Sequence, residues 1–370
     1  MKILILSSNN GQGHNSAAKA LIECADRRGV TAIMMDSMLF ESPKRSELFE
    51  KIHIRSALHA PELFEKGTRL AERMEEDIPL LVYRTGEKHS ERLVRFIRDN
   101  AFDTVIATHV FAAQMLTHVE SRFRESLTTA FVATDYSYIP FTSATYLDAC
   151  FLPHRKLLQR YEENAPGKNY IVSGIPTSAR MTQRTDKARA RSLLGLPLDV
   201  PVALVMTGSM GYGDVLPLLS SLRQQATADT VITVLCGNNN RLAQTLQAAY
   251  ADDAAVRTVG YTERVGLYLD ASDVLLSKPG GLSSTEAAVK GIPLVHITPL
   301  PGWEEDNVSF FTELGLSATG GTPEEMAAAA VLLLSDRDAA SRMTERQHAE
   351  IRPDAGEVIL DTLTKFAKKG

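Results

Sequence analysis

Residues 2–28 read KILILSSNNGQGHNSAAKALIECADRR, which is an apolar run, a glycine-rich loop and an alanine-rich stretch that stops at Gly29. The pattern predicts a strand over residues 2–6 and a helix over residues 16–28. Further apolar runs, with helical stretches between them, lie at residues 31–35, 104–107, 129–133 and 170–174. Short buried strands that alternate with helices are typical of a parallel sheet covered by helices on both faces.

A second series of strands and helices follows a polar, arginine-rich segment at residues 180–191. Its predicted strands lie at residues 202–206, 230–236, 256–260, 273–277 and 293–297. We therefore predict an α/β protein with two Rossmann-like parallel-sheet domains, at residues 1–177 and 178–352, and a C-terminal helix at residues 353–370 that packs back on the first domain. Ligands of such sheets bind beyond the carboxyl ends of the strands.

Composition excludes several classes of protein. The 370 residues are 44% apolar, which suffices for ordinary packed cores. No apolar run approaches the ~18–20 residues of a membrane-spanning helix, and no signal peptide precedes the first strand. A net charge of −5 argues against a nucleic-acid partner. Three widely spaced cysteines, without a C-x-x-C pair, fit a reducing cytosol and offer no thiolate metal site, so we expect a cytoplasmic protein.

The loop at residues 10–14 carries two glycines and ends on His14 at the start of a helix. A helix N-terminus favours an anion and disfavours a cationic imidazole, so His14 is suited to accept a proton. A loop histidine that only forms hydrogen bonds fits the spacing as well. Asp135 ends a nearby strand and is placed to orient His14, while His109 either faces the same site or is a half-buried structural histidine.

Two loops of the second half suit phosphate. Residues 207–213 (TGSMGYG) and 277–286 (SKPGGLSSTE) each follow a predicted strand and lead into a helix, and the second adds the hydroxyls of Ser283 and Ser284. A plain turn between strand and helix is the alternative for residues 207–213. Glu286 has two interpretations, since it fits a capping box with Ser283 and also a carboxylate that binds a ribose diol.

Two further segments are ambiguous. Residues 301–307 (PGWEEDN) suit sugar hydroxyls, and equally a solvated helix start. Residues 41–74 carry acidic and basic residues that nearly balance along a helical pattern, which fits an anionic membrane surface or an ordinary helical hairpin.

Taken together, these motifs resemble GT-B glycosyltransferases of the family 28 kind that make glycolipids, in particular processive diacylglycerol β-glucosyltransferases and monogalactosyldiacylglycerol synthases. The motifs that carry the resemblance are NNGQGHNSAAKAL (9–21), ATDY (133–136), GIP (174–176 and 291–293), CGNN (236–239), GYTERV (260–265), SKPGGLSSTEA (277–287) and PGWEEDN (301–307).

The resemblance implies two domains that face each other across a cleft. It implies an inverting, metal-independent transfer of a hexose from a UDP-sugar to a lipid hydroxyl, of diacylglycerol or its monoglycosylated form. No cofactor is expected, since the UDP-sugar is a substrate. His14 would be the base, supported by Asp135, with Gly13, His109 and Tyr136 on the acceptor side. The enzyme would lie on the inner face of the cell membrane, with contact to its anionic surface.

The donor side is carried over in the same way. Glycines and hydroxyls would hold the diphosphate, Glu286 the ribose, main chain at Tyr261 and Thr262 the uracil, and Glu304 with Asn307 the sugar. The full set of donor positions is Gly208, Ser209, Gly211, Asn238, Tyr261, Thr262, Gly280, Gly281, Ser283, Ser284, Glu286, Glu304 and Asn307.

Two departures from the family leave the acceptor and the donor sugar open. Relatives often have a histidine and an aromatic residue where this chain reads SYIPFT (137–142), and a glutamine where it has Trp303. A transferase with a soluble acceptor, a UDP-sugar epimerase and a non-catalytic nucleotide-sugar sensor are the alternatives.

Overall fold

The computed structural model describes residues 1–8, 12–40, 90–208, 215–299 and 303–367. The chain divides into two compact units. The N-terminal unit comprises Met1–Ala179, Pro301–Trp303 and Arg352–Gly370, and the C-terminal unit comprises Arg180–Leu300 and Glu304–Ile351.

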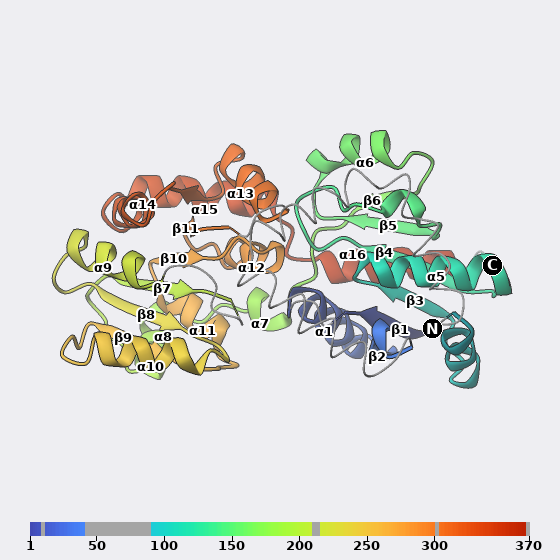
Figure 1. The fold of residues 1–370 in the computed structure, drawn as a ribbon, viewed down its shortest axis with the longest axis horizontal. Coiled ribbons are helices and arrows are strands. Elements are labelled where there is room, and N and C mark those ends of the chain that lie inside the picture. The colour runs from blue at the N-terminus through green and yellow to red at the C-terminus, as the bar shows by residue number, and fades with distance from the viewer. Residues whose placement is uncertain (9–11, 41–89, 209–214, 300–302, 368–370) are drawn as a thin grey trace. The chain divides into compact units, whose positions relative to one another are not determined.

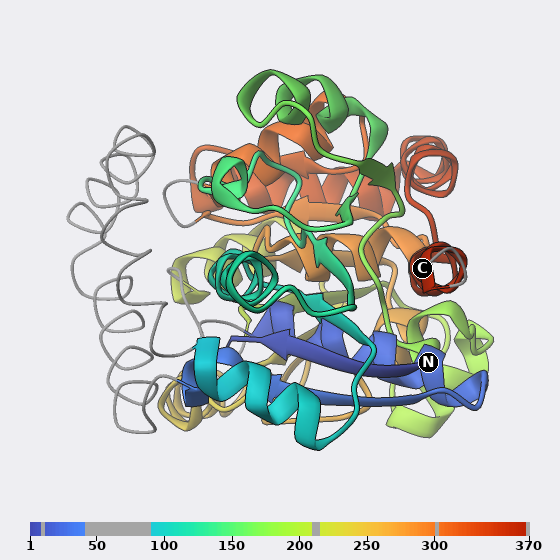
Figure 2. The same ribbon diagram turned by 90° about the vertical axis from the view of Figure 1, so that its right-hand side faces the viewer.

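The N-terminal unit is built on a parallel sheet of strand order β2-β1-β3-β4-β5-β6. Figure 2 looks onto this unit, with β1 and β2 side by side in blue. The strands are β1 (Lys2–Ser7), β2 (Thr31–Asp36), β3 (Thr104–Ala107), β4 (Thr128–Val132), β5 (Ala149–Leu152) and β6 (Tyr170–Val172). The central strands β1, β3 and β4 are almost entirely buried, as expected of a parallel sheet covered on both faces.

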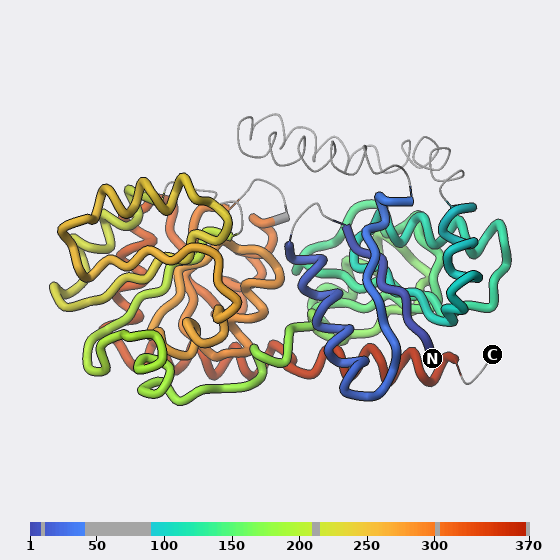
Figure 3. Tube along the Cα trace, turned by 90° about the horizontal axis from the view of Figure 1, so that it is seen from below, coloured from blue at the N-terminus to red at the C-terminus, as the bar shows by residue number. Residues whose placement is uncertain are grey.

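Helices from both ends of the chain cover this sheet. They are α1 (Gln12–Arg27), a helix at residues 90–99, α5 (Val110–Phe123), α6 (Leu158–Asn164) and α16 (Ala355–Ala367), with 3-10 turns η1 (Ser37–Phe40), η2 (Thr142–Ala144) and η3 (Arg155–Leu157). The C-terminal helix α16 packs beside α1, where Ile359 and Leu363 join Ile3 and Leu21 in one core (Figure 3). Arg28 adds ion pairs to carboxylates of α16 at the surface.

The C-terminal unit has a second parallel sheet, of strand order β12-β11-β10-β7-β8-β9 (Figure 1). Its strands are β7 (Val202–Met206), β8 (Val231–Leu235), β9 (Val256–Val259), β10 (Val274–Ser277), β11 (Leu294–His296) and β12 (Ala318–Thr319). Its helices, after the short α7 (Ala179–Thr182), are α8 (Lys187–Leu194), α9 (Val215–Gln225), α10 (Asn240–Ala249), α11 (Val265–Ala271), α12 (Gly281–Lys290), α13 (Trp303–Glu313), α14 (Pro323–Ser335) and α15 (Arg337–Glu350).

The structure contains every predicted strand and two that the sequence did not predict, β5 and β12. β12 has only two residues, too few for a hydrophobic period, and β5 (ACFL) contains none of the β-branched residues that favour a strand. Among the described residues, none of the helices is long and apolar enough to cross a membrane.

Candidate active site

His14 lies at the carboxyl edge of the N-terminal sheet, in the first turn of α1. In that sheet β3 lies between β1 and β4, and the ends of β3 and β4 are followed by Thr108 and Thr134. The Nδ1 atom of His14 lies 2.8 Å from the carbonyl oxygen of Thr108 and 2.9 Å from Oγ1 of Thr134. Three segments that are distant in the sequence therefore meet at one ring nitrogen.

These contacts decide the tautomer of His14. A carbonyl oxygen can only accept, so Nδ1 carries the proton and donates it to Thr108, with the Thr134 hydroxyl oxygen as a second acceptor. Burial lowers the pKa of His14 below the usual 6.5, while the charge of Asp135 and the bond to Thr108 act in the opposite direction. The imidazole is thus favoured in its neutral form, with the lone pair on Nε2 available to take a proton.

His109 packs edge-on against His14, with ring centroids 4.7 Å apart and an interplanar angle of 84°. It is the N-cap of α5, and its Nδ1 accepts the N–H of Phe111 at 3.2 Å. Gly13, His14 and Asp135 are all half-buried at this edge. Tyr136, the next residue, is only 2% exposed. Its place on the acceptor side stays a prediction.

In the C-terminal unit, two glycine-containing loops meet where β7 and β10 are neighbours. Gly208, after β7, has φ +74°, in the left-handed region that favours glycine. A Cβ atom at Gly208 would lie 3.5 Å from Cδ of Lys278, which follows β10. Gly280 is the N-cap of α12 and forms no side-chain cap. A helix N-terminus of this kind suits a phosphate group.

The hydroxyls of α12 have different surroundings. The Ser283 side chain is half-buried, whereas Ser284 is fully buried and its Oγ lies 2.9 Å from Nε2 of His296. Both hydroxyls are predicted to bind phosphate, and that of Ser283 is the more exposed of the two.

Glu286 is not part of a capping box. The N-cap of α12 is Gly280, so Ser283 lies inside the helix and cannot cap it. No described residue forms a hydrogen bond or ion pair with the half-buried Glu286 carboxyl, and burial raises its pKa to about 7. A carboxyl group in this state can accept hydrogen bonds from a diol.

Two residues of α13 hold the loop that leads into α12. The Glu304 carboxylate forms an ion pair with Lys278 at 2.6 Å, and Nδ2 of the fully buried Asn307 donates to the carbonyl oxygen of Pro279 at 2.9 Å. The Nδ2 group of Asn307 thus fixes the Pro279 peptide, and a contact of Asn307 with the donor sugar stays a prediction. Glu304 is 5% exposed and lies at the loop through Lys278.

Known proteins match the chain over nearly its whole length. The monogalactosyldiacylglycerol (MGDG) synthase family matches residues 14–177, and the glycosyltransferase family 28 C-terminal domain matches residues 202–348. The processive diacylglycerol beta-glucosyltransferase of Bacillus licheniformis is 26% identical over 97% of this chain and 93% of that protein. Both halves of the chain thus match glycosyltransferase families, and the fold is that of the GT-B glycosyltransferases.

Solved structures support the fold of this glycosyltransferase. The calicheamicin glycosyltransferase CalG4 superposes with a TM-score of 0.65 at 15% identity, over 100% of this chain and 98% of that one. Anabaena Alr3699/HepE, solved in complex with UDP, superposes with a TM-score of 0.58 at 13% identity, over 99% of this chain and 100% of that one.

The other predicted donor residues of the glycosyltransferase follow β8 and β9. Asn238 and Tyr261 are exposed, the latter 69%, and the half-buried Thr262 accepts the N–H of Arg264 through Oγ1 at 3.0 Å. These loops lie at the same edge of the sheet as Gly280, because all its strands are parallel. Ser209 and Gly211 lie outside the described residues, as do residues 41–74.

Thr108 and Thr134, which orient His14, were not predicted from the sequence. Thr108 and Thr134 each follow an alanine at the end of a strand, in ATH and ATD, and this repeated pair was the available signal. His296 was hidden in an apolar strand. It is fully buried, its ring nitrogens contact the hydroxyls of Ser284 and Ser317, and burial lowers its pKa to about 3.

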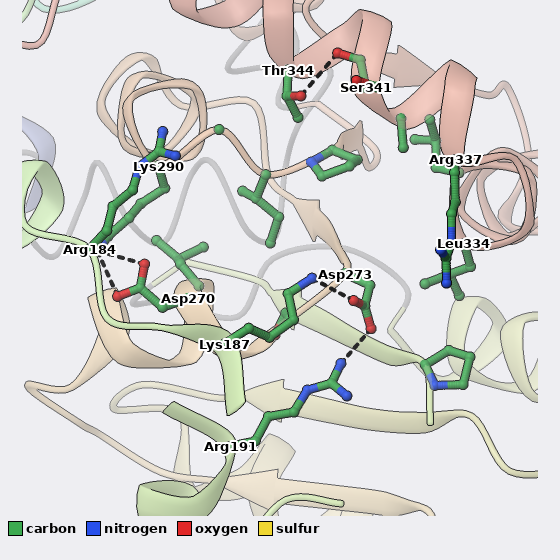
Figure 4. Close-up of a pocket in the computed structure, with 18 of the residues that line it drawn as sticks. Arg184, Lys187, Arg191, Asp270, Asp273, Lys290, Leu334, Arg337, Ser341 and Thr344 are labelled. Carbon is green, nitrogen blue, oxygen red and sulfur yellow. Dashed lines mark hydrogen bonds and ion pairs between the residues drawn. The ribbon is translucent and has the colours of Figure 1, made fainter. Parts of the chain in front are cut away.

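A cavity of about 870 Å³ lies at the opposite, amino-terminal edge of the C-terminal sheet (Figure 4). Lys290 pairs there with Asp270 at 2.9 Å, and Asp273 pairs with Arg191 at 2.6 Å and Lys187 at 2.7 Å. Because Asp273 also accepts the N–H of Val202 beside Arg191, these contacts connect β7, β10 and α8. None of the predicted donor residues lines this cavity.

Proposed function

We propose that this protein is an inverting transferase that moves a hexose from a UDP-sugar to a lipid hydroxyl, of diacylglycerol or its monoglycosylated form, without a metal ion. The observation that carries the proposal is the hydrogen bond from His14 Nδ1 to Thr108, which leaves Nε2 as a base. A nucleotide-sugar sensor has no need of a base. The lipid acceptor is supported by the name of the Bacillus relative and of the matched family.

In this mechanism His14 Nε2 takes the proton of the acceptor hydroxyl while the acceptor oxygen attacks C1 of the sugar. The new C1–O bond forms as the C1–O bond to UDP breaks, and the electron pair of the broken bond moves to the diphosphate oxygen. His14 becomes an imidazolium, which the charge of Asp135 stabilises. Attack by a single acceptor oxygen on the face of C1 opposite the departing diphosphate would give inversion at C1.

For the donor, the α12 N-terminus at Gly280 and Gly281, with the Ser283 hydroxyl, would bind the diphosphate. The Glu286 carboxyl would accept the ribose hydroxyls, and main chain at Tyr261 and Thr262 would bind the uracil. The UDP complex of Anabaena Alr3699/HepE supports the choice of nucleotide. Because the acceptor is a lipid, the enzyme would work on the inner membrane face.

The test is UDP release from UDP-glucose, UDP-galactose and UDP-N-acetylglucosamine, with and without diacylglycerol vesicles, in the presence of a chelator. We expect lipid-dependent UDP release from one of the donors. The His14→Ala variant, which lacks the proposed base, is the inactive control. UDP binding without lipid-dependent release would refute the lipid acceptor and favour a soluble acceptor or a sensor. Conversion of the UDP-sugar without any acceptor would favour an epimerase, and release abolished by the chelator would refute metal independence.

A further inference from the structure

The ammonium group of Lys278 is a cation held inside the donor loop. Its side chain is 19% exposed, and Nζ lies 2.6 Å from Oε1 of Glu304, whose side chain is 6% exposed. An ammonium group has three N–H donors, and among the described residues Glu304 is the one partner of this group. A largely buried cation with unused donors is costly unless a ligand completes its hydrogen bonds.

The backbone places this cation between both loops of the donor edge. The Lys278 N–H donates to the carbonyl oxygen of Met206 at 3.2 Å, which joins the ends of β10 and β7. Its aliphatic chain lies against Gly208, where a Cβ would be 3.5 Å from Lys278 Cδ. Two residues further on, Gly280 begins α12. Lys278 therefore lies in the same loop as the helix end to which the proposed function assigns the diphosphate.

We propose that Lys278 donates hydrogen bonds to the diphosphate of the UDP-sugar and stabilises it as the leaving group. This inference rests on the proposed function. As the C1–O bond to UDP breaks, its electron pair moves to the diphosphate oxygen, and the fixed ammonium offsets the charge that develops there. No proton is transferred by Lys278, since the acceptor proton goes to His14. The lysine thus supplies a charge that metal-dependent transferases take from a divalent cation.

Glu304 has two effects on this lysine. It holds the ammonium group at the loop before the donor binds, and its own charge competes with the diphosphate for the same N–H donors. Removing the positive charge and removing the negative charge should therefore change UDP affinity in opposite directions. If the ion pair only held the loop in shape, both substitutions would lower UDP affinity, because either one breaks the ion pair.

The experiment measures UDP and UMP binding to the full chain by isothermal titration calorimetry. For Lys278→Met we expect the preference for UDP over UMP to fall about 10- to 100-fold, the range for a charge-assisted hydrogen bond. For Glu304→Gln we expect UDP affinity to rise, while Lys278→Arg keeps most of the preference. Lys187→Met is the matched control, because it removes the same charge from the opposite edge of the same sheet.

An unchanged preference for UDP over UMP in Lys278→Met would overturn the inference. So would a loss of UDP affinity in Glu304→Gln, which would assign the pair to loop structure alone. The Glu304→Gln result does not depend on whether Lys278→Met folds, since the lysine stays in place. Failure of the unaltered protein to bind UDP would instead refute the proposed function and the inference with it.

Discussion

Replacing Glu286 with glutamine tests the ribose contact through its dependence on pH. Burial raises the pKa of Glu286 to about 7, so the ionised fraction in the free protein rises from about one tenth at pH 6 to about nine tenths at pH 8. The ionised carboxylate accepts the ribose hydroxyls best, so its pKa falls when UDP binds. UDP affinity should therefore rise about tenfold over this range because of Glu286 alone, and the gain is complete above the free-state pKa.

The assay compares the dissociation constant of UDP for the unaltered protein and for Glu286→Gln at about pH 6, 7 and 8. UDP itself titrates in this range, but the ratio of the two proteins cancels that contribution. We expect the dissociation constant of the variant, divided by that of the unaltered protein, to increase about tenfold from pH 6 to pH 8. The unaltered protein should release a proton on binding UDP near pH 7. Glu345→Gln, which removes a carboxylate from an exposed site on α15, should show no such change. A constant ratio would refute the ribose role.

Three further substitutions test the sites. His14→Ala should lower turnover about 10²- to 10⁴-fold and leave UDP affinity unchanged, since the ring lies in the other unit; equal loss of UDP binding would make His14 structural. The buried His296 ring, with a pKa of about 3, stays neutral in the folded protein, whereas in the unfolded chain it is protonated near pH 6.5. Between about pH 7.5 and 5.5 this difference lowers the free energy of unfolding by about 1.4 kcal/mol. In His296→Gln this part of the pH dependence should be absent, as measured by urea unfolding. Asn307→Ala should lower the free energy of unfolding by about 1–3 kcal/mol, because it leaves the Pro279 carbonyl unpaired. Unchanged stability with an altered sugar preference would instead assign Asn307 to the donor sugar.

The fold could be predicted because its signals are local. Each long strand is a continuous apolar run, and KILIL is buried from Ile3 to Leu6 as such a run requires. The strand β5 was not predicted because ACFL contains no β-branched residue. Its place in the sheet depends on pairing with β4 and β6, which is information that no local window contains.

The candidate site was predictable only in part. The positions of His14 and Glu286 followed from loops at strand ends, which the topology does bring to sheet edges. The contacts of Ser284 and Asn307 could not be predicted, because each is made with a residue that is distant in the sequence, His296 in one case and Pro279 in the other. A side chain's burial is a tertiary property, so a motif identifies a polar residue without showing which way it faces.

The charge states at these sites have a common physical origin in burial. Burial favours neutral His14 and raises the pKa of Glu286 to about 7, and Lys278 is neutralised by Glu304. In each case the free protein avoids an unpaired buried charge, which would destabilise the fold. Substrate binding must then cause any change in the ionisation of Glu286 or in the Lys278–Glu304 ion pair. It follows that UDP binding should by itself release a proton from Glu286 and weaken the ion pair between Lys278 and Glu304, before any sugar is transferred.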